Sequence, residues 1–185
     1  SSEHFAEYVP WFIKQSRKDE LEKYKIPIEE YIDRCEINIK LWNKLEEDMT
    51  PVYEQPLERS HEYASYIIDG VVNNNEITIN ANVMNNGYIE NLPSNCCVEV
   101  PCIINSNGYS PQKFGKLPEH LAALMRTNIN VQILTAEAAL TKKRETIYHA
   151  ALLDPLTAAN LTIDEIYSMT DKMIEAHGNY LPEYK

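Results

Sequence analysis

Glycine is scarce in this sequence, and the glycine-rich motifs that bind phosphate groups are missing. Only 5 of the 185 residues are glycine. Neither a phosphate-binding loop nor the GxGxxG pattern of a dinucleotide-binding turn occurs. The metalloprotease pattern HExxH and the serine-hydrolase pattern GxSxG are missing as well. The sequence therefore lacks the usual signatures of nucleotide binding, zinc proteolysis and serine hydrolysis.

Positive charge and long apolar runs are also in short supply. The formal net charge is -11, which argues against the basic surface that nucleic-acid binding needs. No apolar run approaches the roughly 20 residues that span a bilayer, and no signal-peptide pattern opens the chain. With 44% hydrophobic and 24% charged residues, the composition is that of an ordinary globular domain. We expect no nucleic-acid partner and no membrane partner.

The four cysteines do not form the CxxC pairs of a structural zinc site. Cys96 and Cys97 are adjacent, so on a strand they would point to opposite faces and could not easily bind one metal. With Cys35 and Cys102, they are expected to be reduced and mostly buried thiols. Such thiols are typical of a cytoplasmic protein.

Helical periodicity dominates both ends of the chain. A helix is expected from Pro27 to about Asp48, and its apolar stripe is interpreted as core or as a subunit contact. This stripe comprises Ile28, Tyr31, Ile32, Cys35, Ile39, Trp42 and Leu45. At the start of the last helix, Thr162 and Glu165 have the spacing of a capping box. The other expected helices cover residues 57–72, 119–140, 143–153 and 162–177.

Two strands are expected in the middle of the chain. Residues 76–83 alternate between apolar and polar side chains, as in a half-buried strand. A second strand is expected over residues 97–104, where Pro101 suggests an edge strand or a bulge. Turn signals at residues 85–87 and 106–108 follow the two strands. The predicted fold class is α+β, with mostly helices around a small sheet.

Few residues stand out as chemical groups. His120, His149 and His177 have no second ligand at helical spacing, which favours structural roles, and His61 lies beside Glu62. The start of the chain is richer, because polar side chains alternate there with aromatic ones. Such a cluster suits a sugar-binding wall and suits a domain interface equally well. Its members are Ser2, Glu3, His4, Phe5, Glu7, Tyr8 and Trp11.

Several longer motifs resemble glycoside hydrolase family 4. They include NxGxIxNLP at residues 85–93, CVEVPC at 97–102, GxLP at 115–118 and TNINVQ at 127–132. Within that family, these motifs and the opening SSEHFAEY look most like the α-galactosidase (melibiase) branch. Met84 stands where that branch usually has proline, and Asn95 where it usually has aspartate.

The resemblance implies a fold and a cofactor-dependent reaction. The fold would be like the C-terminal domain of lactate and malate dehydrogenases, with a largely antiparallel sheet. In the family, NAD takes a hydride from C3 of the sugar, manganese stabilises the charge that follows, and the glycosidic bond breaks by elimination. Residues 1–185 would be the C-terminal domain, with the NAD-binding domain and the metal ligands preceding it. By itself this stretch is expected to bind neither cofactor and to be inactive.

The resemblance also implies a location for the general base. It would lie near Ser2 to His4, with Glu3 or His4 able to act. The expected partners are an α-galactoside and further copies of the protein in a homo-oligomer. Two alternatives remain open: a family member that acts on α-glucosides or glucuronides, and a non-catalytic assembly module with exposed apolar helix faces.

Overall fold

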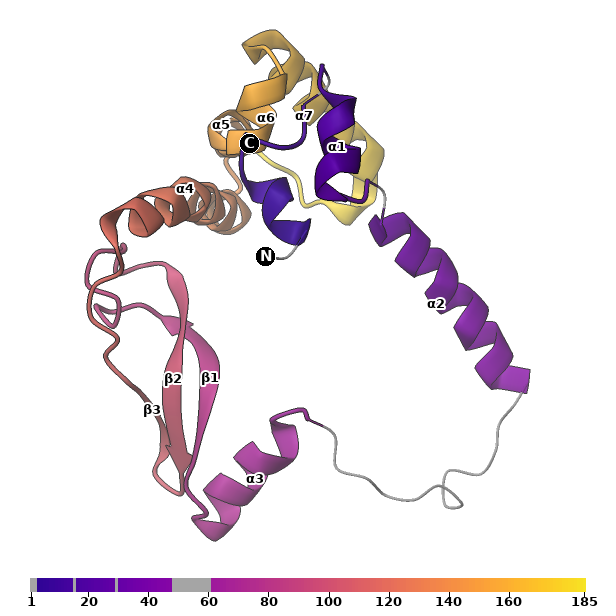
Figure 1. Cartoon of the computed structure of the whole chain (residues 1–185). Helices are drawn as coiled ribbons and strands as arrows, with labels where there is room; N and C mark the ends of the chain where they lie inside the picture. The colour runs from indigo at the N-terminus through magenta and orange to yellow at the C-terminus, as the bar shows by residue number, and fades with distance from the viewer. Residues whose placement is uncertain (1–2, 15, 29, 48–60) are drawn as a thin grey trace.

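The computed structural model describes residues 3–14, 16–28, 30–47 and 61–185. The structure is mostly helical with one small sheet, which agrees with the expected α+β class (Figure 1). The N-terminal part contains η1 (Glu3–Tyr8), α1 (Lys18–Tyr24) and α2 (Glu30–Glu47). Then follow α3 (Ala64–Asn73), β1 (Ile77–Met84), β2 (Cys97–Asn105) and β3 (Gly108–Pro111). The C-terminal part contains α4 (Glu119–Thr141), α5 (Arg144–Leu153), α6 (Pro155–Asn160), α7 (Ile163–His177) and η3 (Gly178–Tyr180). Helices α3 and α4 lie near the two ends of the sheet (Figure 1).

The sheet has three antiparallel strands in the order β1-β2-β3. Both expected strands are confirmed, whereas the short strand β3 was not predicted. The interpretation of Pro101 as a mark of an edge strand or a bulge is wrong, because β2 is the central strand. The Pro101 carbonyl accepts a hydrogen bond from Gln112 N (2.8 Å), immediately after β3 ends. The ring nitrogen of Pro101 faces the same side of β2 as its carbonyl. Because β3 has already ended there, this nitrogen does not need to donate to a neighbouring strand.

The core lies between one face of the sheet, helix α3 and the first half of α4. Every second residue of β2 is buried, from Val98 to Ile104, and Ala122 and Ile129 cover them from α4. Helix α3 packs against β2, with Gly70 at the point of close approach. A Cβ atom at Gly70 would lie 3.2 Å from the Asn75 carbonyl oxygen and 3.4 Å from that of Ile104.

The loop between β1 and β2 is organised by the buried side chain of Asn85. Its amide nitrogen lies 2.9, 3.1 and 3.0 Å from the carbonyl oxygens of Ile89, Leu92 and Pro93. Its amide oxygen accepts a hydrogen bond from Ile89 N at 2.7 Å. Gly87 has a φ of 87°, so the expected turn is present. One side chain therefore folds the loop over the end of the sheet.

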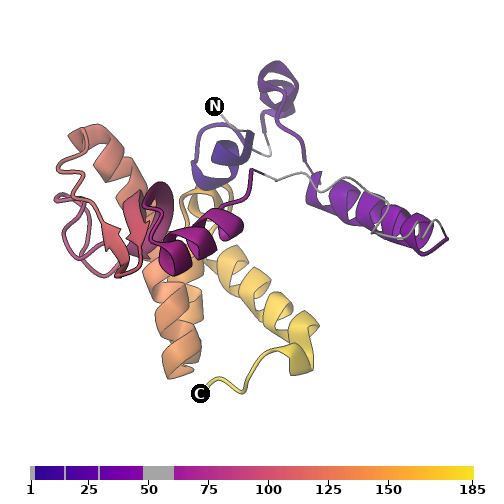
Figure 2. The same ribbon diagram turned by 90° about the horizontal axis from the view of Figure 1, so that it is seen from below.

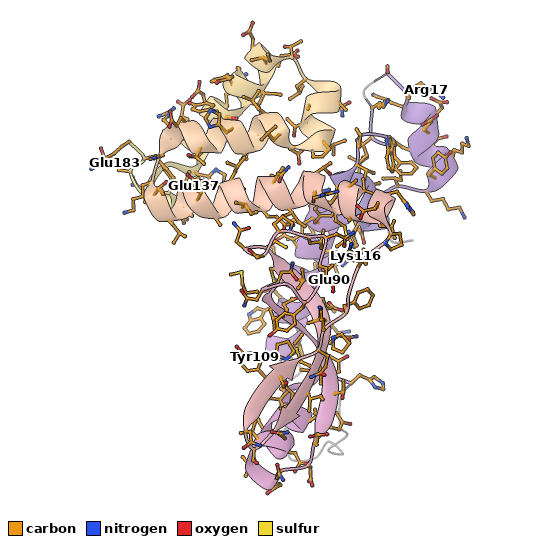
Figure 3. All side chains as sticks on the ribbon, turned by 90° about the vertical axis from the view of Figure 1, so that its left-hand side faces the viewer. Arg17, Glu90, Tyr109, Lys116, Glu137 and Glu183 are labelled. Carbon is orange, nitrogen blue, oxygen red and sulfur yellow. The ribbon has the colours of Figure 1, made fainter. Side chains whose placement is uncertain are left out.

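A second asparagine joins this loop to the start of α4. Asn91 donates to the Leu117 carbonyl oxygen (2.8 Å) and accepts from Leu117 N (3.0 Å). Glu90 and Lys116 mark this junction in Figure 3. A hydrogen bond from Lys113 lowers the pKa of the Glu90 carboxyl. The two Asn91 hydrogen bonds hold the loop, and with it the sheet, in a defined position relative to helix α4.

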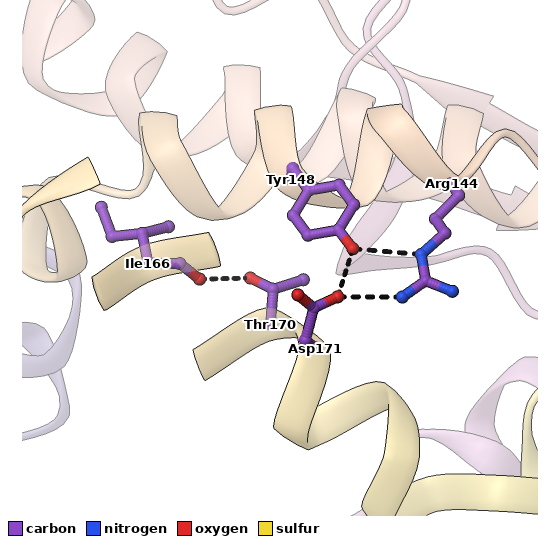
Figure 4. Close-up of polar contacts among 5 residues, drawn as sticks. All are labelled: Arg144, Tyr148, Ile166, Thr170 and Asp171. Atoms are coloured by element: carbon purple, nitrogen blue, oxygen red, sulfur yellow. Dashed lines mark hydrogen bonds and ion pairs between the residues drawn. The ribbon is translucent and has the colours of Figure 1, made fainter. Parts of the chain in front are cut away.

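Helices α4 to α7 pack against one another into a helical layer, with α4 nearest the sheet (Figure 1). The Thr162 capping box is confirmed. The short helix α6 was missed, because Asp154-Pro155 ends α5 and also begins the next helix, with Asp154 accepting from Thr157 N at 2.7 Å. Asp171 on α7 binds Arg144 and Tyr148 on α5 (Figure 4), which ties the two helices together.

Helices α2 and α3 depart from expectation. Helix α2 lies away from the sheet and from α4 to α7 in both views (Figures 1 and 2). Tyr31 is 80% exposed and Trp42 71%, so the interpretation of the stripe as core is wrong for this chain. Part of the helix expected over 57–72 lies outside the described residues, and α3 starts only at Ala64.

Candidate functional site

The candidate site is the N-terminal segment, residues 3–14, which the sequence singled out. Its first half is the 3-10 helix η1, and its second half has no regular secondary structure. Two small apolar side chains anchor it, since Ala6 is 4% exposed and Val9 is completely buried. Helix η1 also contacts α6. The segment is therefore attached to the helical layer rather than lying loosely over it.

The two predicted catalytic residues both lie on η1. Glu3 is its first residue, and His4 follows with an exposed side chain. An imidazole can accept or donate a proton near neutral pH, so an exposed histidine can serve a bound substrate as a general base. The segment thus offers proton-transfer chemistry at the surface of the domain.

Aromatic rings accompany His4 along the segment. Phe5, Tyr8 and Trp11 are 40%, 50% and 52% exposed, so each ring keeps part of its surface open to a ligand. The Phe5 and Trp11 rings are tilted to each other, with centroids 6.5 Å apart, and edge-to-face contacts follow from Trp11 through Phe12 to Tyr24 on α1. Rings packed edge to face have a preferred mutual orientation. Half-exposed rings beside polar groups are the usual lining of a small-molecule site.

Two asparagines from distant helices hold the backbone of this segment. Asn128 on α4 donates to the Tyr8 carbonyl oxygen at 3.1 Å. Asn160, the last residue of α6, donates to the Ile13 carbonyl oxygen at 2.9 Å. Sequence patterns do not point to either residue, because hydrogen-bond partners 120 and 147 positions apart leave no local signal.

A groove runs beside the end of the segment. It has a volume of about 570 Å³. Its polar lining consists of Lys14, Lys18, Thr157 and Asn160. The remaining lining is apolar, with Ile13, Leu21, Ile28, Leu156 and Leu161. The N-terminal segment therefore borders a hollow on the surface.

A second cavity, of about 350 Å³, lies among α4, α5 and α7, away from the predicted residues. Its lining is almost entirely aliphatic, with Ala138, Ala150 and Met173 among its walls. His177 also lines it, with Nδ1 2.6 Å from the Met173 carbonyl oxygen. One ring nitrogen is thereby used within its own helix, which agrees with the structural role expected for His177.

The described residues do not form a metal centre. Within them, no three histidine, cysteine, aspartate or glutamate side chains are grouped so as to hold an ion. Cys96 is buried, which raises the pKa of its thiol, whereas the adjacent Cys97 is exposed. Only Cys97 lies on a strand, because β2 begins there, so the expected placement of the pair on one strand is not met. The donor atoms present therefore do not fit manganese, and no glycine-rich turn is present to hold a dinucleotide.

No helix among the described residues has the length and apolar character needed to cross a membrane. The longest, α4, carries charged and amide side chains along its length, including Arg126 and Gln132.

Comparison with known proteins finds relatives both in sequence and in structure. The alpha-galactosidase of Bacillus subtilis is 47% identical over 185 residues, which are all of this chain and 43% of that protein. A putative glucosidase of Bacillus subtilis superposes with a TM-score of 0.73 and 26% identity, over 92% of this chain and 38% of the other. The 6-phospho-beta glucosidase of Thermotoga maritima, solved with manganese, NAD+ and glucose-6-phosphate, has a TM-score of 0.64 and 24% identity. That match covers 82% of this chain and 36% of the other.

The chain thus spans less than half the length of each of these relatives. The family described as the family 4 glycosyl hydrolase C-terminal domain matches residues 1–157, from the candidate site through the sheet to α6. Together with the identity over the whole chain, this match shows that the chain belongs to family 4 of the glycosyl hydrolases, as a C-terminal domain of that family.

Proposed function

We propose that the complete protein hydrolyses α-galactosides and that this chain supplies one wall of its sugar site. The observation that carries the proposal is the 47% identity to an alpha-galactosidase over all 185 residues. A second relative, the alpha-galactosidase of Rhizobium meliloti, is 32% identical and also covers the whole chain. The matches to phosphoglucosidases cover only about two thirds of the chain, which favours the galactosidase branch.

Within this wall, the N-terminal segment has two tasks. The half-exposed rings of Phe5, Tyr8 and Trp11 offer apolar faces to the C–H groups of a sugar ring. His4 is the proton acceptor that we assign to the reaction, with Glu3 as the alternative. NAD and manganese are proposed as cofactors of the complete protein. The described residues do not fit NAD or manganese, so the role proposed for this chain is limited to sugar contact and proton transfer.

The assay uses the complete protein with nitrophenyl α-galactoside, NAD and manganese. We expect turnover that requires both cofactors and exceeds turnover of the matching α-glucoside and glucuronide. Higher turnover of either of those two sugars would reassign the substrate. The absence of turnover on all three would favour a non-catalytic assembly module.

A variant separates the two candidate bases. His4→Asn keeps a polar side chain but removes the proton acceptor, and we expect kcat to fall by about 100-fold or more. Glu3→Gln is the matched substitution one residue away, and it should retain most of the activity. The opposite pattern would make Glu3 the base. If both variants are as active as the wild type, the base must lie outside this segment.

We also propose that the complete protein is a homo-oligomer in which α2 pairs with its copy. Two pairs of residues in the α2 stripe are placed symmetrically about the midpoint between residues 38 and 39. Ile32 and Leu45 are equidistant from this midpoint, and so are Cys35 and Trp42. An antiparallel copy would therefore place each of these residues opposite its counterpart, as a two-fold contact requires. Ile32, Trp42 and Leu45 are all more than half exposed in the single chain.

A matched pair of isoleucines tests this contact. Ile39 lies on the stripe and is 62% exposed, whereas Ile37 lies on the opposite face and is 54% exposed. Ile39→Asp should shift the complete protein to a smaller species in sedimentation velocity, and Ile37→Asp should not. A wild-type protein that sediments as a monomer contradicts the proposal, as does an unchanged Ile39→Asp variant.

A further inference from the structure

Two side-chain amides define where the N-terminal segment lies. Asn128 binds the Tyr8 carbonyl oxygen, and Asn160 binds that of Ile13. These carbonyls stand on either side of Trp11, in a stretch with no strand or α-helix to order it. The two donors come from different helices, α4 and α6. The segment is thus held at two points, one at the last residue of η1 and one near the end of the segment.

The apolar anchors of the segment do not determine its position in the same way. Val9 and Ala6 are buried, but apolar contacts are non-directional and tolerate sliding. Hydrogen bonds to a carbonyl oxygen weaken steeply when the angle or the distance changes. The asparagine amides therefore determine the register and tilt of the backbone that presents His4 and the three exposed rings.

We propose that Asn128 and Asn160 are positioning residues for sugar hydrolysis, which act by holding the segment that carries His4. This inference rests on the proposed function of that segment. Neither asparagine is required to touch the sugar. Catalysis is sensitive to such placement, because an error of about 1 Å in a reacting group can cost about 100-fold in rate.

The test is made with the complete protein and isosteric variants. Asn128→Asp and Asn160→Asp replace the donor NH2 with an oxygen that repels the carbonyl it faced. We expect kcat to fall about 10- to 100-fold in each, with KM changed less. Asn128→Gln keeps the donor and should recover part of the lost rate.

The matched control is Asn130→Asp, on the same helix α4. Asn130 is exposed and lies two residues from Asn128, so it faces roughly the opposite side of the helix. The Asn130→Asp substitution introduces the same charge at nearly the same level along the axis of α4. We expect this variant to keep the wild-type kcat and KM. Equal losses in the Asn130 and Asn128 variants would show a charge effect and overturn the inference.

A second measurement distinguishes failure of the inference from failure of the proposed function. Backbone hydrogen exchange of residues 3–14 should be faster in Asn128→Asp and Asn160→Asp than in the wild type, with exchange over residues 85–96 unchanged. An active wild type with variants that keep their kcat overturns the inference. If the wild type hydrolyses no glycoside, the proposed function fails, and exchange alone decides whether the asparagines hold the segment. Unchanged exchange over residues 3–14 then overturns the inference.

Discussion

Asparagine performs a similar structural task in two regions of this domain, with different consequences. In the loop of residues 85–96, Asn85 is completely buried and its partners lie at most eight residues away. At the N-terminal segment, the asparagines are Asn128 on α4 and Asn160 on α6, and both lie nearer the surface. Each binds a backbone carbonyl more than a hundred residues away in the chain. The first arrangement stabilises a fold, whereas the second positions a surface.

The comparison also separates recognition from chemistry. Residues 82–118 hold most of the motifs that resemble the family, and the structure uses them for the sheet, its loop and the junction with α4. The residues suited to proton transfer and sugar contact lie at the other end of the chain. Changes in the loop should therefore lower stability, and changes around the segment should lower activity.

The largest effect on stability is expected from Asn85→Leu. The substitution leaves Ile89 N and the carbonyls that Asn85 bound without their partner inside the protein. We expect a loss of about 3 kcal/mol in the free energy of unfolding. Urea denaturation measures it, with Asn107→Leu in the exposed β2–β3 turn as the control. A loss equal to that of the control would mean that Asn85 does not organise the loop.

A smaller loss is expected from Gly70→Val, at the contact of α3 with β2. The added Cβ would lie 3.2 Å from a backbone oxygen, and the branched side chain needs still more room. We expect a cost of about 1–3 kcal/mol. The neighbouring Val72→Thr, at a position 72% exposed, should change stability by less than about 0.5 kcal/mol. Thermal denaturation measures the Tm of each variant. Equal Tm values would mean that α3 does not pack tightly at Gly70.

Removal of the helix cap by Thr162→Ala should cost about 1 kcal/mol. The Thr162 hydroxyl accepts from Glu165 N, and the Glu165 carboxylate accepts from Thr162 N at 2.8 Å, which lowers the pKa of Glu165. Thr162→Ser keeps the hydroxyl and should retain most of the stability. Both variants should keep wild-type kcat, because this cap lies in the scaffold. A loss of kcat at unchanged Tm would break the division between the two regions.

The smallest effect is expected from Asp171 and depends on pH. Its hydrogen bonds from Tyr148 and Arg144 lower the pKa of the carboxyl in the folded protein. A carboxyl with a lowered pKa contributes stability above its unfolded pKa and loses it as the pH falls through the folded value. The Tm advantage of the wild type over Asp171→Asn should therefore be full at neutral pH and shrink as the pH falls below about 4 toward the lowered pKa of the folded protein. An advantage that grows in acid would contradict this account.

Local patterns predicted much of the scaffold. The alternation in residues 76–83 and the capping box at Thr162 are properties of short stretches, and both are confirmed. Helix α6 was missed because Asp154-Pro155 can end one helix and begin another. The stripe of α2 shows the limit of periodicity, since spacing reveals an apolar face but not what covers it.

The candidate site was only partly predictable, for a related reason. Residue chemistry drew attention to Glu3, His4 and the neighbouring rings. What holds them could not be inferred, because the partner of Tyr8 is 120 residues away on another helix. Long-range hydrogen bonds to backbone carbonyls place no demand on the sequence around the acceptor, so only the folded structure reveals them.

Hydrogen exchange of the complete protein, with and without saturating galactose, tests most directly the claim that residues 3–14 form a wall of the sugar site. The account predicts that the sugar slows exchange in residues 3–14 and leaves residues 85–96 unchanged. Slowing confined to residues 85–96, or no change in residues 3–14, would contradict it.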